Sequence, residues 1–305
     1  YPGYWEESEK NVLNIVKKII GQGTGQRRFL DAGCGEGRLI PFFADQFNEI
    51  VAIDPDQERL RVAVELVCDL GLSGRTLIKQ VAIEDFDDDN KFDFILCSHV
   101  LQHVHTASVP VIIKKLRDLI KEDGVLCITT CHSTEENGYF EKEIIKNSEL
   151  LNGPIYESEF NSLINSSGIL PVHFFEFGEI EKLLADNGFK IVEFRVFHLE
   201  RMPEGYENVE GIDNIVNLDP ELKETNGLDM MISAMPIRED DKMIAETKYQ
   251  NNFEEKLLNF KEAYLGIFYA FSMDGIKDSA LDREKAKKII NGYKITSGRL
   301  IADWD

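Results

Sequence analysis

Short apolar runs alternate with segments of helical periodicity along the first 130 residues of the chain. A strand followed by a helix and then by another strand is the pattern of a parallel sheet with right-handed crossover connections. This order predicts an α/β fold with a doubly wound sheet, whose ligand crevice lies at the carboxyl ends of the strands. The strands predicted in this part are residues 28–32, 50–53, 76–81, 92–97 and 125–130.

The middle of the chain adds two strands and an irregular region. Residues 190–199 and 228–235 have strand patterns, so the complete sheet is predicted to have seven strands. Residues 133–175, which follow the fifth strand, are polar in places and contain several glycines and prolines. An insertion of this length beside a crevice is typical of a lid or a substrate platform.

The last part of the chain is predicted to be helical and without strands. Largely aromatic residues recur at alternate steps of four and three between Phe253 and Phe271, which lays one apolar stripe along a helix. The sequence leaves three roles open for this stripe. It packs on this chain's own sheet or insertion, it forms a homodimer, or it forms a wall of the substrate site. We therefore predict a domain over residues 1–240, with the insertion at 133–175, and a helical extension over 241–305.

The acidic balance of the chain limits its partners. Its 305 residues include 55 Asp and Glu against 34 Lys and Arg, which gives a formal net charge of −21. This charge repels phosphate backbones and anionic lipids, so we expect neither nucleic acid nor a membrane as a partner. No apolar run approaches the roughly 18 residues of a membrane span, and the five cysteines lack the spacing of a disulfide framework. The resulting prediction is a cytoplasmic protein with reduced thiols.

Three glycines at alternate positions follow the first strand, in the segment "FLDAGCGEGRL". Gly33, Gly35 and Gly37 allow backbone dihedral angles that are closed to other residues, and we expect a ligand to contact main-chain N–H groups there. Asp54 ends the second strand, where a carboxylate accepts hydrogen bonds from both hydroxyls of a ribose. The Gly-x-Gly-x-Gly spacing disfavours a nicotinamide site. Together these residues predict a ligand that carries a ribose.

Five consecutive segments carry a resemblance to a known family. They are "LDAGCGEGRL", "IVAIDPDQERL", "VAIEDF", "FDFILCSHVLQHV" and "LIKEDGVLCITT". In order and spacing they resemble the motifs of the class I S-adenosylmethionine-dependent methyltransferases, and the resemblance runs from about residue 4 to about residue 236. It implies a Rossmann-like fold with an antiparallel seventh strand, S-adenosyl-L-methionine as the cofactor and methyl transfer as the activity.

The resemblance also implies which residues hold the cofactor. Asp54 would accept hydrogen bonds from the ribose hydroxyls, and Pro55 would lie against the face of the adenine. Ser98, at the end of the fourth strand, would approach the methionine part. The remaining cofactor residues are Asp31, Gly33 and Gly35 against the amino acid part, and Ala82, Ile83 and Glu84 near the adenine edge.

Catalysis of methyl transfer makes few demands on side-chain chemistry. A sulfonium methyl group is already a strong electrophile, so the protein chiefly holds a nucleophile in line and excludes water. A base is needed only for hydroxyl or ammonium acceptors, and the candidates are His103, His99 and His132, each with packing as its alternative role. Cys131, beside His132, suggests a nucleophile or ligand, but no second cysteine stands at metal spacing, and we predict no metal site.

The predicted function is methyl transfer from S-adenosyl-L-methionine to an O, N or C atom of a small-molecule acceptor that lies under the insertion. Two alternatives stay open. One is a protein or peptide N-methyltransferase, and the other is a non-catalytic protein that binds S-adenosylmethionine. Tight binding of the cofactor without turnover on any acceptor would favour the non-catalytic protein.

Overall fold

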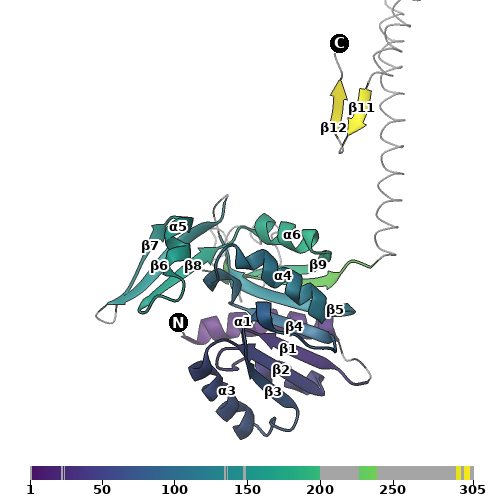
Figure 1. The fold of residues 1–305 in the computed structure, drawn as a ribbon, viewed down its shortest axis with the longest axis vertical. Coiled ribbons are helices and arrows are strands. Elements are labelled where there is room, and N and C mark those ends of the chain that lie inside the picture. Colours follow the sequence, from purple (N-terminus) through teal and green to yellow (C-terminus); the bar gives the residue numbers. More distant parts are fainter. Residues whose placement is uncertain are drawn as a thin grey trace, which may run out of the picture. The chain divides into compact units, whose positions relative to one another are not determined.

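The computed structural model describes residues 2–21, 23, 25–133, 135, 137–146, 149–199, 227–238, 293–296 and 299–302. The chain divides into two compact units, Tyr1–Arg238 and Glu239–Asp305, and each is described by itself. The large sheet, the helices that cover it and the insertion all belong to the first unit (Figure 1).

Seven strands form one sheet in the first unit. They are β1 (Arg28–Ala32), β2 (Glu49–Asp54), β3 (Thr76–Gln80), β4 (Phe92–Ser98), β5 (Ile120–Cys131), β9 (Phe189–Leu199) and β10 (Gly227–Pro236). Their order is β3-β2-β1-β4-β5-β10-β9, and only β10 runs antiparallel to its neighbours. The predicted fold class is therefore confirmed. The strand order reverses at β1, which is the position where open α/β sheets bind ligands.

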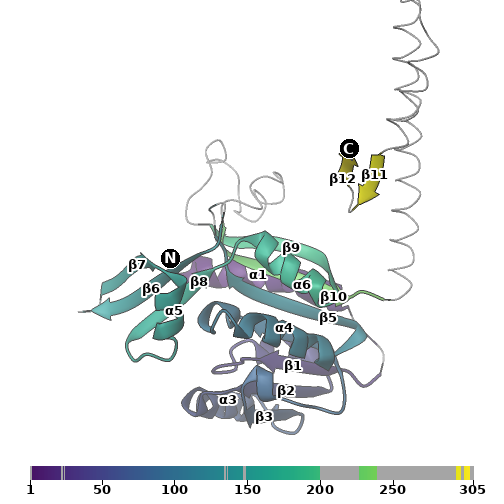
Figure 2. The same cartoon turned by 45° about the horizontal axis from the view of Figure 1, so that its top comes forward.

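Helices cover both faces of this sheet and bury two apolar clusters. The cluster on one face includes Val16 of the first helix, and the cluster on the other includes Ile112 and Ile180 of two later helices. Figure 2 shows the two layers on opposite sides of the strands. Burial on both sides explains why the central strands read as almost continuous apolar runs. The helices are α1 (Pro2–Ile20), α3 (Gln57–Asp69), α4 (Ser108–Leu119) and α6 (Phe177–Asp186).

The segment between β1 and β2 differs from its prediction. A helix was expected over residues 37–47, but α2 covers only Ile40–Phe43 and the 3-10 helix η1 covers Ala44–Gln46. The cause is Gly37, whose φ of 77° lies outside the right-handed helical region. The chain therefore turns at this glycine before any helix begins.

The insertion contains its own small sheet, which the sequence pattern did not predict. Its strands β6 (Tyr139–Lys146), β7 (Glu149–Ile155) and β8 (Ile169–Phe174) pair antiparallel in the order β7-β6-β8, and α5 (Glu157–Leu163) connects β7 to β8. The glycine and proline in "ELLNGPI" hid β7, because proline is tolerated on an edge strand such as this one. In Figure 1 this sheet projects beside the carboxyl end of the large sheet.

The second unit has two described strands, β11 (Tyr293–Thr296) and β12 (Arg299–Ala302), which pair antiparallel. They lie in the range that was predicted to have no strands, so the prediction is wrong for these residues. The aromatic stripe at 253–271, and with it the choice between packing on this chain, a homodimer and a wall of the substrate site, lies outside the described residues.

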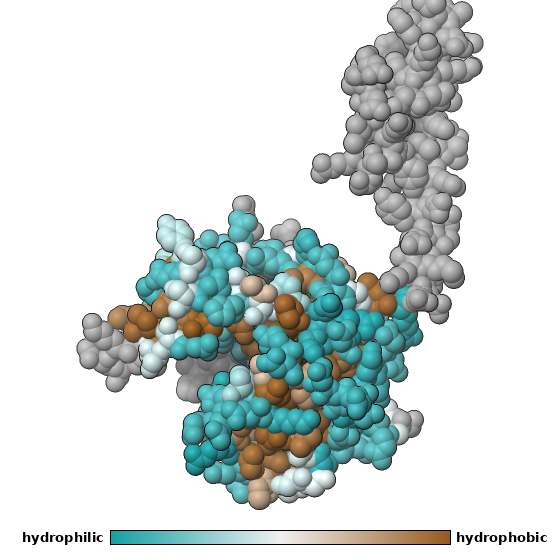
Figure 3. Space-filling view, viewed as in Figure 1, coloured by the Kyte–Doolittle hydropathy of each residue, from teal (hydrophilic) through white to brown (hydrophobic). Residues whose placement is uncertain are grey.

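The exposed surface of the first unit is largely hydrophilic on the face drawn in Figure 3. Larger apolar side chains are exposed near α3 and in the insertion, among them Val64, Leu77 and Leu151. None of the helices described in the structure is long and apolar enough to cross a membrane.

Candidate active site

A cavity of about 530 Å³ opens at the carboxyl ends of β1, β2 and β4. The turns that follow β1, β2, β3 and β4 form most of its wall, and Ile164 and Asn165 of the insertion complete it. All predicted cofactor residues except Gly35 belong to this wall: Asp31, Gly33, Asp54, Pro55, Ala82, Ile83, Glu84 and Ser98. The sequence motifs thus meet at one cavity, while the contacts of these residues with a cofactor stay a prediction.

The glycine turn after β1 is closed by its own hydrogen bonds. The N–H groups of Gly33 and Cys34 donate to the carbonyl of Ile53 at 2.8 and 2.9 Å. The N–H of Gly35 donates to Asp54 Oδ2 at 2.8 Å. The N–H of Gly37 donates to the carbonyl of Cys34 at 2.9 Å, so the N–H groups of all three glycines are donated within the protein, and the expected contact of a ligand with main-chain N–H groups there stays a prediction.

The glycines are required for conformation and close approach. Gly33 and Gly35 adopt φ values of 80° and 53°, which residues with a side chain rarely adopt. A Cβ atom on Gly33 would lie 2.3 Å from Cγ2 of Val100, and one on Gly35 would lie 2.6 Å from the guanidinium of Arg59. The turn thus brings the chain after β1 into contact with the turn after β4 and with the start of α3, and this packing shapes the cavity.

Asp54 is held by the backbone on both of its oxygens. Oδ2 accepts from the N–H of Gly35 at 2.8 Å, and Oδ1 accepts from the N–H of Asp56 at 2.9 Å. The side chain is buried at the end of β2 and lines the cavity. Since a carboxylate oxygen accepts more than one hydrogen bond, the cavity offers two fixed acceptors to a pair of neighbouring hydroxyl groups.

Asp31 lines the cavity with a carboxylate that lacks a full set of partners. The residue is only 3% exposed, and its Oδ2 accepts no hydrogen bond. Burial and, less strongly, the negative charge of Asp54 raise the pKa of Asp31 to about 7, against the opposing effect of Arg38. A buried carboxylate oxygen without a donor is unfavourable, so this position favours a ligand that brings N–H donors and positive charge.

Arg38 and Glu9 are charged residues that the sequence analysis missed. Arg38 lines the cavity, and its Nη2 lies 2.9 Å from Oε1 of Glu9, a buried residue of α1. This ion pair fixes a guanidinium in the same wall as Asp31 and Asp54. Arg38 directly follows the third glycine of the turn, and this position could have indicated that it lies near the cavity. Its partner Glu9 stands 29 positions earlier, and the local sequence gives no indication of that pairing.

His103 is a predicted base that lines the cavity and whose tautomer the structure defines. Its Nδ1 lies 3.0 Å from the carbonyl oxygen of Pro171 in the insertion. Because a carbonyl only accepts, this contact assigns the proton to Nδ1 and leaves the lone pair on Nε2. Burial lowers the pKa of His103, which keeps the ring neutral at neutral pH. Since His103 also lines the cavity, it has the position and the tautomer of a base.

The other two predicted bases lie in different settings. His99 lines the cavity, and its Nδ1 lies 2.9 Å from Nε2 of Gln102. His132 is 2% exposed, its Nδ1 lies 2.8 Å from the carbonyl of Gly227, and it is not among the wall residues. The structure thus brings His99 and His103 to the cavity but not His132.

A family model described as a methyltransferase domain matches residues 4–194. The chain belongs to this family. Curated relatives of this methyltransferase domain are described as ubiquinone biosynthesis O-methyltransferases. The one from Glaesserella parasuis is 34% identical over 114 residues, which cover 35% of this chain and 47% of the relative. The one from Rickettsia typhi is 26% identical over 211 residues, which cover 68% of this chain and 78% of the relative.

Solved methyltransferase structures share the fold of this domain. A S-adenosylmethionine-dependent methyltransferase from Clostridium acetobutylicum superposes with a TM-score of 0.50 at 14% identity, covering 76% of this chain and 92% of the other. The methyltransferase domain spans about half the length of the first of its curated relatives. The predicted family is confirmed by the match to the family model, and the fold by the structural likeness.

Proposed function

We propose that this chain is an S-adenosyl-L-methionine-dependent methyltransferase that methylates a hydroxyl oxygen of a small molecule. The observation that carries this proposal is the buried carboxylate of Asp31, whose Oδ2 has no partner in the wall of the cavity. The methionine part of S-adenosylmethionine bears an ammonium group, which supplies both the positive charge and the N–H donors that this carboxylate lacks.

The other side chains of the cavity fit the rest of the same cofactor. Asp54, with both oxygens fixed by backbone N–H groups, would accept the two ribose hydroxyls. The guanidinium of Arg38 would suit the carboxylate of the methionine part, and Ser98 would lie near that part. We assign the adenine to the stretch of wall made by Pro55, Ala82, Ile83 and Glu84.

The proposed chemistry divides between the cofactor and the chain. When bound, S-adenosylmethionine would supply an electrophilic methyl group for transfer to the acceptor oxygen and would leave as its demethylated thioether. The chain holds the hydroxyl in line and excludes water. Nε2 of His103 takes the proton of the hydroxyl, because Nδ1 already carries a proton toward Pro171. The assignment of His103 as the base rests on this tautomer and on its place in the wall.

Two observations support a small acceptor with a hydroxyl group. Relatives at 34% and 26% identity are described as O-methyltransferases of ubiquinone biosynthesis. The cavity of about 530 Å³ is lined on one side by Ile164 and Asn165, so the acceptor would lie between the cofactor and the insertion.

A cytoplasmic location is part of the proposal, since all five cysteines are free thiols that suit a reducing compartment.

Calorimetry with S-adenosylmethionine and with NAD tests the cofactor assignment. We expect S-adenosylmethionine to bind and NAD to give no heat. Asp54→Ala should weaken the binding by about 1.5–3 kcal/mol, the range for lost hydrogen bonds to a charged group, without loss of the fold. Binding of NAD alone, or unchanged affinity in Asp54→Ala, would contradict the proposal.

Turnover assays with labelled S-adenosylmethionine test the acceptor. The expected result is methylation of a phenolic or other hydroxyl compound and none of peptides. Methylation of peptide amines instead would establish a peptide N-methyltransferase. Tight binding of the cofactor with no transfer to any hydroxyl, amine or carbon acceptor would establish a non-catalytic binding protein.

A further inference from the structure

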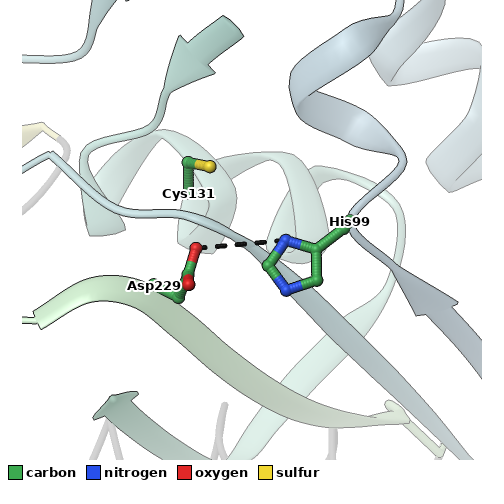
Figure 4. A group of neighbouring side chains, drawn as sticks. All are labelled: His99, Cys131 and Asp229. Carbon is green, nitrogen blue, oxygen red and sulfur yellow. Dashed lines mark ion pairs between the residues drawn. The ribbon is translucent and has the colours of Figure 1, made fainter. Parts of the chain in front are cut away.

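We propose that His99, Cys131 and Asp229 form a binding site for one divalent metal ion of the zinc class. In the part of the chain that the structure describes, these three residues are the group whose imidazole nitrogen, thiol sulfur and carboxylate oxygen all lie within 4.8 Å of one another. Figure 4 shows the three side chains gathered around one space.

The sheet itself brings the three residues together. His99 directly follows β4, Cys131 ends β5, and Asp229 lies near the start of β10. β5 and β10 run antiparallel with Cys131 opposite Asp229, while β4 and β5 run parallel and end side by side. Three neighbouring strands therefore hold the donors at one edge of a rigid sheet, so the group does not depend on the conformation of a long loop.

The donor set selects the kind of ion. Zinc binds imidazole nitrogen, thiolate sulfur and carboxylate oxygen at about 2.0–2.3 Å, so tetrahedral ligands lie about 3.3–3.6 Å apart. Side-chain rotations that draw the group together by roughly 1 Å would reach this geometry. A thiolate disfavours magnesium and calcium, which take oxygen ligands. Three protein ligands leave a fourth position for water or another molecule, as in catalytic rather than structural zinc sites.

Two neighbouring residues orient the donors. Nδ1 of His198 lies 2.5 Å from Oδ2 of Asp229, and this contact turns Oδ1 toward His99, whose Nδ1 is 3.9 Å away. The ring of His99 also contacts Gln102, whose Oε1 accepts from Thr130 at 2.9 Å. Carboxylates that bind a metal are in turn hydrogen-bonded by outer residues, as Asp229 is by His198. An ion bound at Nδ1 of His99 would replace its contact with Gln102, whereas one bound at Nε2 would keep it.

The burial of the group gives the ion an electrostatic role. Asp229 is 7% exposed, and a divalent cation at Oδ1 would add to the partner that His198 already gives to Oδ2. His99 lines the cavity, while Cys131 and Asp229 do not, so the ion would lie behind the wall with His99 between it and the acceptor. This inference is independent of the proposed methyl transfer, because none of the three residues belongs to the assigned cofactor contacts or is the assigned base.

Cobalt(II) is the probe that tests the site without any activity measurement. The full chain is treated with a chelator and titrated with cobalt(II) chloride while its absorption is recorded. We expect one equivalent to bind, with visible bands of tetrahedral cobalt and a thiolate-to-cobalt charge-transfer band in the near ultraviolet. Added zinc should remove all of these bands by displacing cobalt.

The variants separate this cluster from other thiols of the chain. Cys131→Ser should abolish the charge-transfer band, and Asp229→Asn and His99→Gln should each weaken cobalt binding at least tenfold. Cys34→Ser, which changes the thiol in the wall of the cavity, and Cys68→Ser, which changes an exposed one, should leave the spectrum unchanged. Circular dichroism and thermal unfolding of each metal-free variant show whether it is folded, and only folded variants are compared.

Three results would overturn the site. The first is the absence of cobalt or zinc binding to the full chain at micromolar concentrations. The second is a charge-transfer band that survives Cys131→Ser or that disappears in Cys34→Ser. The third is cobalt affinity within twofold of the original in the folded Asp229→Asn protein, because the carboxylate is the only acid among the three ligands.

Discussion

The two walls of the cavity are built in different ways. The cofactor wall, at 31–39, 54–59 and 82–84, is joined by hydrogen bonds between neighbouring turns, such as that of Gly35 with Asp54, 19 positions apart. The other wall, called the insertion wall because it contacts the insertion, consists of 99–108 with Ile164 and Asn165. It is joined by contacts such as that of His103 with Pro171, 68 positions apart.

This difference shows which wall of the cavity depends on the fold of the insertion and which does not. A turn that is closed by nearby backbone groups holds its carboxylates whatever the insertion does. The insertion wall instead depends on how 133–175 folds, because Pro171 assigns the tautomer of His103 and Asn161 accepts from the N–H of Thr106 at 3.0 Å. We therefore expect changes in the cofactor wall to affect binding of the cofactor, and changes in the insertion wall to affect turnover.

The largest expected effect concerns turnover in His103→Gln. Loss of a base lowers kcat by about 10²–10⁴-fold for a hydroxyl acceptor. Calorimetry should find S-adenosylmethionine affinity within twofold of the original, and added imidazole should restore part of the rate. His105→Gln is the matched control, since His105 is an exposed residue of the same wall. An unchanged kcat in His103→Gln would contradict the assignment of turnover to the insertion wall.

The next effect concerns the stability of the cofactor wall in Gly33→Ala. The new Cβ would lie 2.3 Å from Val100 on a backbone with φ of 80°, so we expect a loss of about 2–4 kcal/mol in the free energy of unfolding. Cofactor binding should weaken in parallel. Urea unfolding measures the change, and Gly74→Ala is the control because open space surrounds that glycine. Equal stability of the two variants would show that the turn tolerates a side chain.

A third effect concerns the pH dependence of the insertion. Burial lowers the pKa of His173 in β8 to about 4, and its ring stacks on Phe140 while Nε2 lies 3.9 Å from Oε2 of Glu179. The unfolded chain takes up a proton at this histidine near pH 6.5, before the folded chain does. The stability present above that pH is therefore lost as the pH falls toward 4.

The expected loss between pH 7 and pH 5 is about 2 kcal/mol in the free energy of unfolding. His173→Phe keeps an aromatic ring in the stack and removes the titration, so its unfolding free energy should change less over the same range. Urea unfolding of both proteins at the two pH values gives the comparison. If His173→Phe loses as much stability as the original chain, another group is responsible.

The sequence predicted the cofactor wall far better than the insertion wall, for a physical reason. Asp31 and Asp54 each lie at the carboxyl end of a strand whose apolar run is visible, and parallel strands that end together bring such residues to one edge. The strands of the insertion were missed, because β7 contains Gly153 and Pro154 and because β6 also pairs with the more distant β8. The hydrogen bonds that close the glycine turn were missed as well, since the pattern shows the freedom of glycine but not the partner of each N–H.

The sequence also failed to predict which residues the candidate metal cluster brings together. Cys131 stood out because of its neighbour His132, but the structure turns His132 toward Gly227 and places Cys131 beside Asp229 instead. Asp229 had no signal of its own, because it lies in an apolar strand nearly one hundred positions further on. Only the antiparallel register of β10 on β5 puts the two residues opposite each other.

The smallest expected effect concerns the pH dependence of cofactor binding. The pKa of Asp31 is raised to about 7 by burial first and by Asp54 second, with Arg38 opposing them. Below pH 7 the free chain holds a proton on this carboxylate, which a cationic ligand must displace. Affinity for S-adenosylmethionine should therefore be nearly constant from pH 7.5 to 7 and fall by up to about tenfold for each pH unit below 7.

Calorimetry in two buffers of different ionisation enthalpy counts the protons released. At pH 6 we expect close to one proton released for each S-adenosylmethionine bound. Asp31→Asn should bind more weakly at pH 7.5, release no proton at pH 6 and show a flat profile between these values. A steep profile that persists in Asp31→Asn would assign the proton to another group, and the ammonium of the cofactor would then have to lie against a different part of the wall.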